Sequence, residues 1–293
     1  MLRKTSLGFI VSLCLSMVCW LPNAMGQEAA EKPKEQPVRS PYEAVMLVDF
    51  PTTKTPTAGA FEYYIHHRFG TFENGWSDLQ GIYAPSNIRM GLNYGITRRV
   101  SIGFGTEKNH KMQEFNVAYR IFDQTRSNKM PVAIMYYGNM VVDARNKSVF
   151  GVNYEGSNRL SYFNQLIFSR KFSKSITLQT ALSFSHFNSV DSLLEHDKIA
   201  WHFAGRVKLW SDNSFIFEYT QPLEPKNFAE HLELTNPPQA GLSLGLELGT
   251  STHAFQVFVS NYQEIIPQQN VSFNQHDFWD GQILIGFNMT VRI

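Results

Sequence analysis

The sequence predicts an all-β protein: a single up-and-down antiparallel transmembrane β-barrel of about twelve strands, with both termini periplasmic. Three observations predict it. From about residue 60 to residue 293, segments of alternating apolar and polar residues follow one another. The connections between them are alternately short and long. The polar face carries more charge than a dry protein core tolerates. Together these features are typical of barrels in the outer membrane of a Gram-negative bacterium.

The chain begins with the pattern of a secretory signal peptide. A basic start at Arg3 precedes an apolar run over residues 7–21, and small residues lead to an expected cleavage after Gly26. The run is too short for a membrane-spanning helix. A lipoprotein would instead carry its lipid on Cys19, but the bulky residue before this cysteine fits that alternative poorly. We therefore expect residues 1–26 to be removed during export to the outer membrane.

Charge and cysteine content exclude several function classes. The chain has 26 basic and 25 acidic residues and two cysteines. The leader contains two of the basic residues and both cysteines, so the mature chain has a formal charge of −1 and no thiol. It therefore lacks a disulfide, a cysteine-based metal site and the basic field that nucleic acid requires. A mean hydropathy of −0.24 agrees with a barrel, because each strand hides half of its residues from lipid.

The segment that follows the leader differs in composition from the rest of the chain. Residues 27–41 are charged, contain three prolines and have little to bury, which predicts a flexible periplasmic linker. Residues 42–293 are then the outer-membrane β-barrel. Residues 43–50 are apolar, and two interpretations stay open: a short strand, or a segment against the barrel mouth.

Alternation and turn composition predict the individual strands. The expected ranges are 60–69, 86–96, 100–108, 112–122, 131–142, 159–170, 175–187, 198–210, 214–222, 240–250, 253–263 and 281–293. Short connections follow the even strands and long ones follow the odd strands, with 109–111 as the one short exception. An even strand number with short periplasmic turns places both chain ends in the periplasm.

Two short turns allow the register of their hairpins to be predicted, because opposed residues must point to the same face. A three-residue turn at 211–213 would set Leu209 opposite Phe215 toward lipid. The same register would set Arg206 opposite Glu218 on the inner face, as a cross-strand pair of opposite charge.

The second hairpin has a two-residue turn at 251–252. This turn sets Leu246 opposite Val257 on the lipid face. It also places Phe258 across from Gly245, where the aromatic ring covers a bare glycine. Both hairpins therefore agree on which face is apolar.

A soluble barrel or sandwich is the alternative fold, with the apolar face turned inward. The length of the strands disfavours it, because most have 10–13 residues, which exceed the usual strand of about 5–6 in soluble sheets and suit a tilted crossing of a bilayer. Aromatic residues near strand ends also suit the membrane interfaces. These are Tyr63, Trp201, Tyr219, Tyr262 and Trp279.

Several stretches resemble an outer-membrane β-barrel family of unknown function that is common in the Bacteroidota. They are His67-Arg68-Phe69-Gly70, residues 87–97, 160–162, 169–173 and 252–261, and Gly286-Phe287-Asn288. The resemblance spans about residues 45–293. The chain departs from the family pattern at Thr252, where glycine is usual, and at Ile293, where an aromatic is usual. The resemblance implies a membrane barrel and supplies no activity.

Candidate reactive groups do not form a convincing set. His66 and His67 are adjacent on a strand and point to opposite faces, so they do not share a metal. Ser185 and His186 would need a third residue and a geometry that adjacency does not provide. Two loops carry acids whose oxygens could bind Ca²⁺, but neither loop has the spacing of an EF-hand. These acids are Asp191, Glu195, Asp197, Glu224, Glu230 and Glu233. No nucleotide or metalloprotease motif is present. We expect no catalytic residue, metal or cofactor.

The sequence leaves two main functions open, and a lipid-modifying enzyme is a further alternative. The first is a narrow channel for small hydrophilic solutes, with a mild anion preference if its wall charges are not neutralised. Its predicted pore-lining residues are Arg89, Asn93, Arg120, Gln179, His202, Arg206, Lys208, Glu218, Glu247 and Asn288. The second is a closed barrel that docks a partner through its long extracellular loops or its N-terminal linker. Either barrel would meet lipid and lipopolysaccharide, and its last strand would meet the insertion machinery. The sequence does not determine the oligomeric state.

Overall fold

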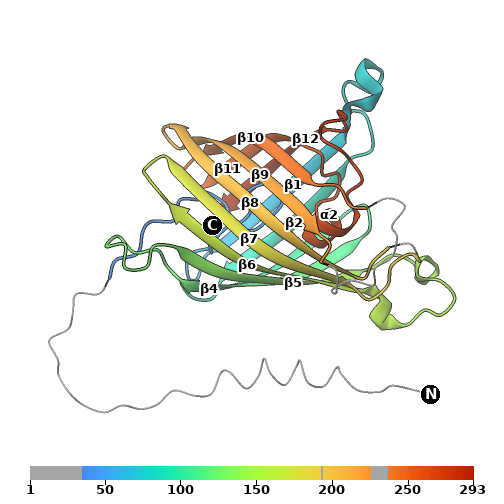
Figure 1. Cartoon of the computed structure of the whole chain (residues 1–293), viewed down its shortest axis with the longest axis horizontal. Coiled ribbons are helices and arrows are strands. Elements are labelled where there is room, and N and C mark those ends of the chain that lie inside the picture. The colour runs from blue at the N-terminus through green and yellow to red at the C-terminus, as the bar shows by residue number, and fades with distance from the viewer. Residues whose placement is uncertain (1–34, 193, 226–236) are drawn as a thin grey trace, which may run out of the picture. The chain divides into compact units, whose positions relative to one another are not determined.

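The computed structural model describes residues 35–192, 194–225 and 237–293, and residues 36–293 form one compact unit (Figure 1). Twelve antiparallel strands close into a barrel in which β1 pairs with β12. The strands are β1 (Phe61–Thr71), β2 (Asn87–Gly95), β3 (Val100–Glu107), β4 (Met112–Phe122), β5 (Ala133–Asp143), β6 (Leu160–Lys171), β7 (Ile176–Phe187), β8 (Asp197–Trp210), β9 (Asn213–Leu223), β10 (Gly241–Gly249), β11 (His253–Ser260) and β12 (Leu284–Arg292). The predicted fold class and strand number are confirmed. The predicted signal peptide and residues 27–34 of the predicted linker lie outside the described residues.

Among the described residues, the helices are short and lie only in the connections between strands. They are η2 (Phe72–Asp78), η3 (Lys147–Phe150), η4 (Gly156–Arg159) and α2 (Pro267–Phe273). None of them is long and apolar enough to cross a membrane.

The two ends of the barrel differ in the length of their connections, as the sequence predicts. Connections after even strands have two to ten residues, and we call this end the turn end. Most connections after odd strands are longer, with 108–111 as the short exception, and we call this end the loop end. The first and last strands begin and finish at the turn end, where Phe61 and Ile293 exchange backbone hydrogen bonds of 3.0 and 2.9 Å.

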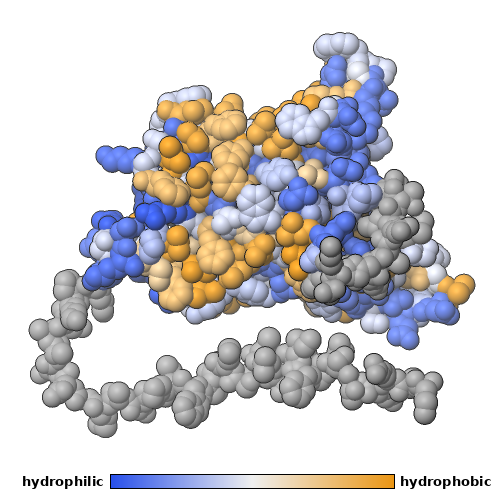
Figure 2. Space-filling model, in the orientation of Figure 1, coloured by the Kyte–Doolittle hydropathy of each residue, from blue (hydrophilic) through white to orange (hydrophobic). Residues whose placement is uncertain are grey.

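Apolar side chains face outward, and charged side chains face inward. Phe104, Phe115 and Leu182 are 44–54% exposed, although they lie in the middle of regular strands. Inward-facing Arg89 and Glu247 are at most 1% exposed. Figure 2 shows hydrophobic residues over much of the strand surface on one face, with hydrophilic residues gathered toward the two ends. This is the facing expected of a barrel with lipid outside.

The two predicted registers have different outcomes. In the hairpin of β10 and β11, Leu246 lies opposite Val257 and Gly245 opposite Phe258, as predicted. In the hairpin of β8 and β9 the predicted register is wrong. The turn has only two residues, 211 and 212, and a bulge between Lys208 and Trp210 shifts the pairing, so that Arg206 lies opposite Ile216. The shift is even, and the apolar residues therefore still face outward.

Residues 42–55 lie inside the barrel, and this answers the question that the sequence left open about residues 43–50. We call residues 42–55 the plug. They belong to none of the twelve strands, and Leu47, Val48 and Phe50 are fully buried. From the loop end, α2 enters the same lumen and packs against β6, β7, β8 and β9. Before the plug, Val38 and Gln36 share backbone hydrogen bonds with residues 124 and 126 of the β4–β5 turn, inside the predicted linker.

Candidate functional site

The candidate site is the lumen, where wall side chains bind the backbone of the plug. The carboxylate of Glu218 on β9 accepts hydrogen bonds from the amides of Asp49, at 2.7 Å, and Phe50, at 3.2 Å. Asn288 on β12 donates to the carbonyl of Val48 at 2.8 Å, and Gln179 on β7 donates to that of Pro51 at 2.8 Å. A buried irregular segment needs such partners, because it has no strand neighbour to satisfy its amides and carbonyls.

A buried ion pair fixes the centre of the plug. Arg68 on β1 lies 2.8 Å from the carboxylate of Asp49, and both side chains are fully shielded from solvent. The Arg68 guanidinium also donates to Asn288 at 3.0 Å and lies 4.5 Å from the ring centre of Phe258. One cation from β1 thus joins the plug to β11 and β12. Breaking a buried pair by removing one partner typically costs about 3–5 kcal/mol.

The opposite side of the plug is apolar. The ring of Phe50 lies 4.3 Å from His202 on β8 and 6.0 Å from Phe163 on β6, measured between ring centres. Val271 of α2 belongs to the same buried cluster. This inner surface of β5 to β8 is more apolar than the alternation predicts, and it gives the plug a dry surface to pack against.

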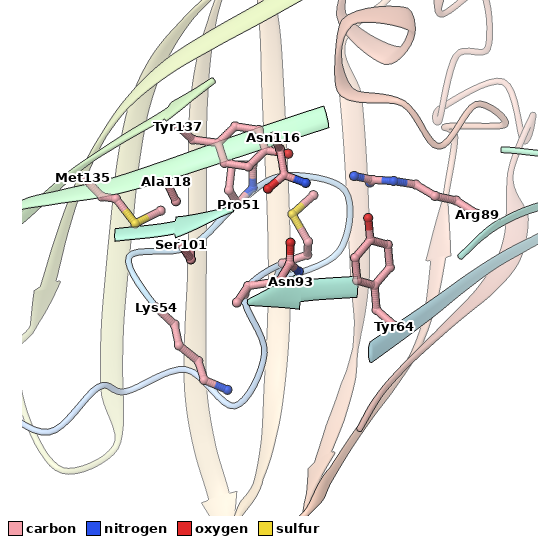
Figure 3. Close-up of a pocket in the computed structure, with 12 residues that line it drawn as sticks. Pro51, Lys54, Tyr64, Arg89, Asn93, Ser101, Asn116, Ala118, Met135 and Tyr137 are labelled. Carbon is pink, nitrogen blue, oxygen red and sulfur yellow. The ribbon is translucent and has the colours of Figure 1, made fainter. Parts of the chain in front are cut away.

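The plug and α2 meet within the lumen. Asn270 of α2 donates a 3.4 Å hydrogen bond to the carboxylate of Asp49. A cavity beside the plug has about 20 Å³ available to the centre of a water molecule, room for a single water. Figure 3 shows Pro51 and Lys54 of the plug sharing this cavity with Arg89 and Tyr137 of the wall. Among the described residues, the two segments together fill the lumen at this level.

Six of the predicted pore-lining residues contact the plug. Gln179, Glu218 and Asn288 bind its backbone and His202 packs on Phe50, as described above. Arg120 hydrogen-bonds Thr55, and Arg206 lies 3.7 Å from the Glu43 carboxylate.

The remaining four bind mainly to the wall or line the small cavity, and His202 binds wall side chains as well. Arg89 forms an ion pair with Glu114, and Glu247 forms one with Arg206 at 2.6 Å. His202 lies between Ser183 and Thr220, at 2.7 and 2.9 Å. Lys208 pairs with Asp212 at the turn end, and Asn93 lines the small cavity. The anion preference expected of unneutralised charges has no support here, because these cations have acidic neighbours.

Three important residues were not predicted as part of the site. Asp49 sits in a segment whose place the sequence left open. Glu114 binds Arg89, Tyr137 and Asn139, and its inward position follows from the alternation of β4, which was a usable signal. Arg68 was noted only within the family motif. A charged residue at an inward position of β1 was the available signal for it.

The family motif at the end of β1 has a structural basis. His67 faces outward and stacks on Phe287 with 5.2 Å between ring centres, whereas His66 is buried. Arg68 binds the plug. A Cβ on Gly70 would lie 2.3 Å from the Cβ of Ala84, so only glycine lets the β1–β2 loop approach so closely.

The remaining candidate groups are not brought together as a catalytic or Ca²⁺ site. Ser185 faces inward, while His186 faces outward and binds Asp197 at 2.6 Å and Asn188 at 3.0 Å through its two ring nitrogens. Neither nitrogen is free to act as a base toward a serine. Glu195 and Glu224 both approach Lys198, at 2.5 and 3.7 Å. Of the other loop acids, Glu230 and Glu233 lie outside the described residues.

A separate polar group lies at the loop end, outside the strands that cross the membrane. There the carboxylate of Glu264 raises the pKa of the His110 imidazole above its usual value, and partial burial opposes this effect. The interaction between His110 and Glu264 therefore links the β3–β4 connection to the β11–β12 connection.

Comparison with known proteins shows the family to which the chain belongs. A family model described as a membrane-bound β-barrel domain (DUF5777) matches residues 42–292. No curated protein sequence matches the chain. Among solved structures, the NanC porin has 10% identity and a TM-score of 0.46, covering 79% of this chain and 98% of its own. LpxR from Salmonella typhimurium has 10% identity and a TM-score of 0.38, with coverage of 79% and 99%. The TodX monoaromatic hydrocarbon channel has 7% identity and a TM-score of 0.36, with coverage of 81% and 90%.

Proposed function

This chain belongs to the DUF5777 family of membrane-bound β-barrel domains, and from that premise we propose that it is a gated passage for small hydrophilic solutes across the outer membrane of a Gram-negative bacterium. The plug closes the passage at rest, and its withdrawal opens it. The observation that carries the proposal is an irregular segment that fills the lumen and is held by side chains rather than by strand pairing. The proposal gives the barrel no catalytic role and no cofactor.

The polar character of the wall supports a removable plug. Replacing a buried ion pair by well-packed apolar residues is often neutral or stabilising, so a permanently closed barrel has little need of Arg68, Arg89 or Glu218 inside. A wall that is periodically wet does need such residues. When the plug leaves, water replaces its hydrogen bonds to Glu218 and Asn288, and the net cost of each exchanged bond is only about 0.5–1.5 kcal/mol.

The size and connections of the barrel support the same function. A twelve-strand barrel has a lumen wider than an eight-strand barrel and narrower than a porin. The plug follows directly on residues 27–41, which the sequence predicts to be a periplasmic linker. A periplasmic event that moves the linker would then also move the plug.

A reversible covalent lock on the plug tests the proposal. A Cβ at Gly249 would lie 3.1 Å from Cγ of Glu43, so Glu43→Cys with Gly249→Cys brings two cysteines near disulfide distance. After the expected leader cleavage the chain has no other thiol. Conductance in planar bilayers is recorded for the oxidised and reduced forms of this variant. Glu43→Cys alone is the control for the loss of the Glu43 ion pairs, and Gly249→Cys alone is the control for the added side chain.

We expect openings in the reduced form that oxidation abolishes. We also expect Phe50→Ala to raise the open probability by at least about a hundredfold, because truncating a buried Phe costs about 3–5 kcal/mol. Equal conductance of the oxidised and reduced forms would contradict gating by the plug. Silence of Phe50→Ala with an intact heat-modifiable barrel would contradict passage altogether.

A closed docking barrel is the second candidate, and one observation favours it. The lumen is filled from both ends, by the plug and by α2, and the two share an apolar cluster through Phe50 and Val271. In that case the long connections at the loop end, or the N-terminal linker, would bind a partner. Silence of every variant in the conductance experiment is the result that this second candidate predicts.

A further inference from the structure

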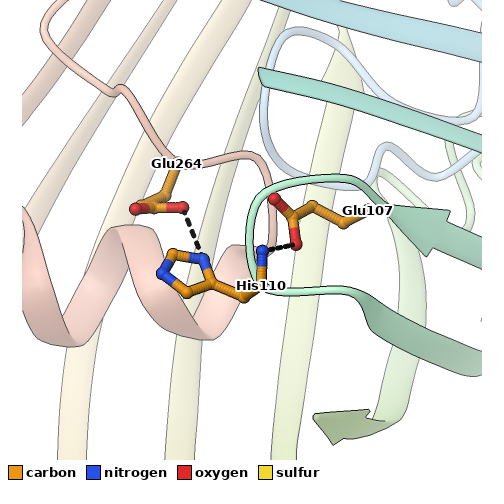
Figure 4. A group of neighbouring side chains, drawn as sticks. All are labelled: Glu107, His110 and Glu264. Atoms are coloured by element: carbon orange, nitrogen blue, oxygen red, sulfur yellow. Dashed lines mark hydrogen bonds and ion pairs between the residues drawn. The ribbon is translucent and has the colours of Figure 1, made fainter. Parts of the chain in front are cut away.

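Three side chains of metal-binding type converge at the loop end (Figure 4). Glu107 is the last residue of β3, and His110 lies in the connection that follows. Glu264 comes from the β11–β12 connection, just before α2. Nδ1 of His110 is 3.5 Å from Oε2 of Glu264, and the candidate ligand atoms of the three residues all lie within 4.8 Å of one another. The fold thus brings together donors that are distant in the sequence.

A fourth side chain, from α2, contacts this cluster. Gln269 of α2 is only 4% exposed, and its Nε2 lies 3.2 Å from Nδ1 of His110. Its Oε1 has no hydrogen-bond partner among the described residues. The two ends of an amide have nearly the same shape, so a flip presents this oxygen to the cluster. Oε2 of Glu264 is likewise shielded from solvent, and it forms an ion pair with the His110 imidazole at 3.5 Å.

We propose that Glu107, His110 and Glu264 bind one divalent transition-metal ion such as Zn²⁺, with the Gln269 amide as a neighbouring oxygen donor. An imidazole nitrogen favours Zn²⁺ over Ca²⁺ or Mg²⁺, and two carboxylates balance its charge. Zinc bonds to nitrogen and oxygen are about 2.0–2.2 Å, so two ligands of a tetrahedral ion lie about 3.3–3.6 Å apart. Donor atoms as far apart as 4.8 Å would therefore approach by roughly 1.2–1.5 Å when the ion binds, a movement within the reach of side-chain rotation.

The orientation of Glu107 fits this role. Its two carboxylate oxygens accept hydrogen bonds from the amides of Asn109, at 2.6 Å, and His110, at 2.9 Å. These bonds hold the carboxylate in place, and each oxygen keeps a lone pair for the metal. The bound ion would tie the β3–β4 connection to the segment that leads into α2. This inference does not depend on the passage function.

Zinc titration of the purified full-length protein in detergent tests the site by calorimetry. We expect one tight equivalent of Zn²⁺ in the wild type and at least tenfold weaker binding in His110→Gln and in Glu264→Gln. His253→Gln, at the turn end, is the matched control and should bind as the wild type does. Ca²⁺ should not compete at equal concentration. The shift in electrophoretic mobility of each variant between unheated and heated samples verifies that the barrel is folded.

Hydrogen exchange gives a second readout that a simple His–Glu ion pair would not produce. Zn²⁺ should slow exchange in residues 264–273 of the wild type and leave Glu264→Gln unchanged. Absence of zinc binding in the folded wild type would overturn the proposal. Equal affinity in all variants would overturn it as well, because the ion would then be bound elsewhere.

Discussion

Arg68 shows how a single buried cation positions a whole segment. It is fully shielded from solvent, yet it has an acid, an amide oxygen and an aromatic face as neighbours. Two of these neighbours belong to the wall, whereas Asp49 belongs to the plug. The carboxylate of Asp49 therefore offsets the desolvation cost of burying the Arg68 cation inside the barrel. Arg68 in turn fixes the position of Asp49, because the buried carboxylate needs this partner.

Removing this cation should loosen the plug without unfolding the barrel. Arg68→Ala leaves Asp49 buried and unpaired, which we expect to cost about 3 kcal/mol locally. Backbone amides of residues 47–50 should then exchange hydrogen about a hundredfold faster, measured by mass spectrometry. The double variant with Asp49→Ala should recover part of this protection. Unchanged exchange in Arg68→Ala would show that the pair does not hold the plug.

At the scale of elements, the β8–β9 hairpin shows where pattern reasoning fails. Alternation alone allows any even shift of register, because each such shift keeps the apolar side chains outside. The bulge near Lys208 shortens the turn and moves Arg206 away from Glu218. Arg206 binds Glu247 of β10 instead, at 2.6 Å. Such a bulge depends on local twist rather than on hydrophobic pattern.

A charge swap distinguishes the two registers. Arg206→Glu places a third acid beside Glu43 and Glu247, and we expect it to lower the free energy of unfolding by about 3–5 kcal/mol. Adding Glu247→Arg should restore most of this loss, whereas adding Glu218→Arg should not. Urea titration of the barrel in lipid vesicles measures both effects. Rescue by Glu218→Arg alone would support the predicted register instead.

The inner and outer faces of the strands should respond differently to the same truncation. Phe163 on β6 is fully buried against Phe50, while Phe115 on β4 is 48% exposed on the lipid side. Phe163→Ala removes a surface on which the plug packs, and it should speed hydrogen exchange at residues 47–50. Phe115→Ala, the matched control, should leave that exchange unchanged. An equal effect of both variants would mean that the plug does not rely on this apolar contact.

At the scale of the whole molecule, the barrel combines a wall built from neighbouring strands with a filling that comes from two distant parts of the chain. The plug precedes β1, and α2 lies between β11 and β12. The wall forms by pairing of strands that follow one another in the chain, and β1 closes it by pairing with β12. The position of the filling depends on the closed wall, because its partners are spread around the barrel on β1, β7, β9 and β12.

Removal of the plug should make the barrel permeable in a size-dependent way. We expect vesicles containing a variant without residues 42–55 to swell in small sugars, with rates that fall steeply as the solute grows. Vesicles with the wild type should swell slowly. If the shortened variant is folded and vesicles containing it do not swell, α2 is sufficient to close the lumen, and the proposed opening by withdrawal of the plug is contradicted.

The sequence by itself determined the fold class, the twelve strands, the two unlike ends and the facing of nearly every strand residue. These features follow from a two-residue period and from pairing between neighbours in the chain, and both are local properties. Only the tertiary structure decided that residues 42–55 fill the lumen and which charges pair. Their apolar and acidic residues suit an edge strand as well as a plug, and the choice depends on partners that closure of the barrel brings together.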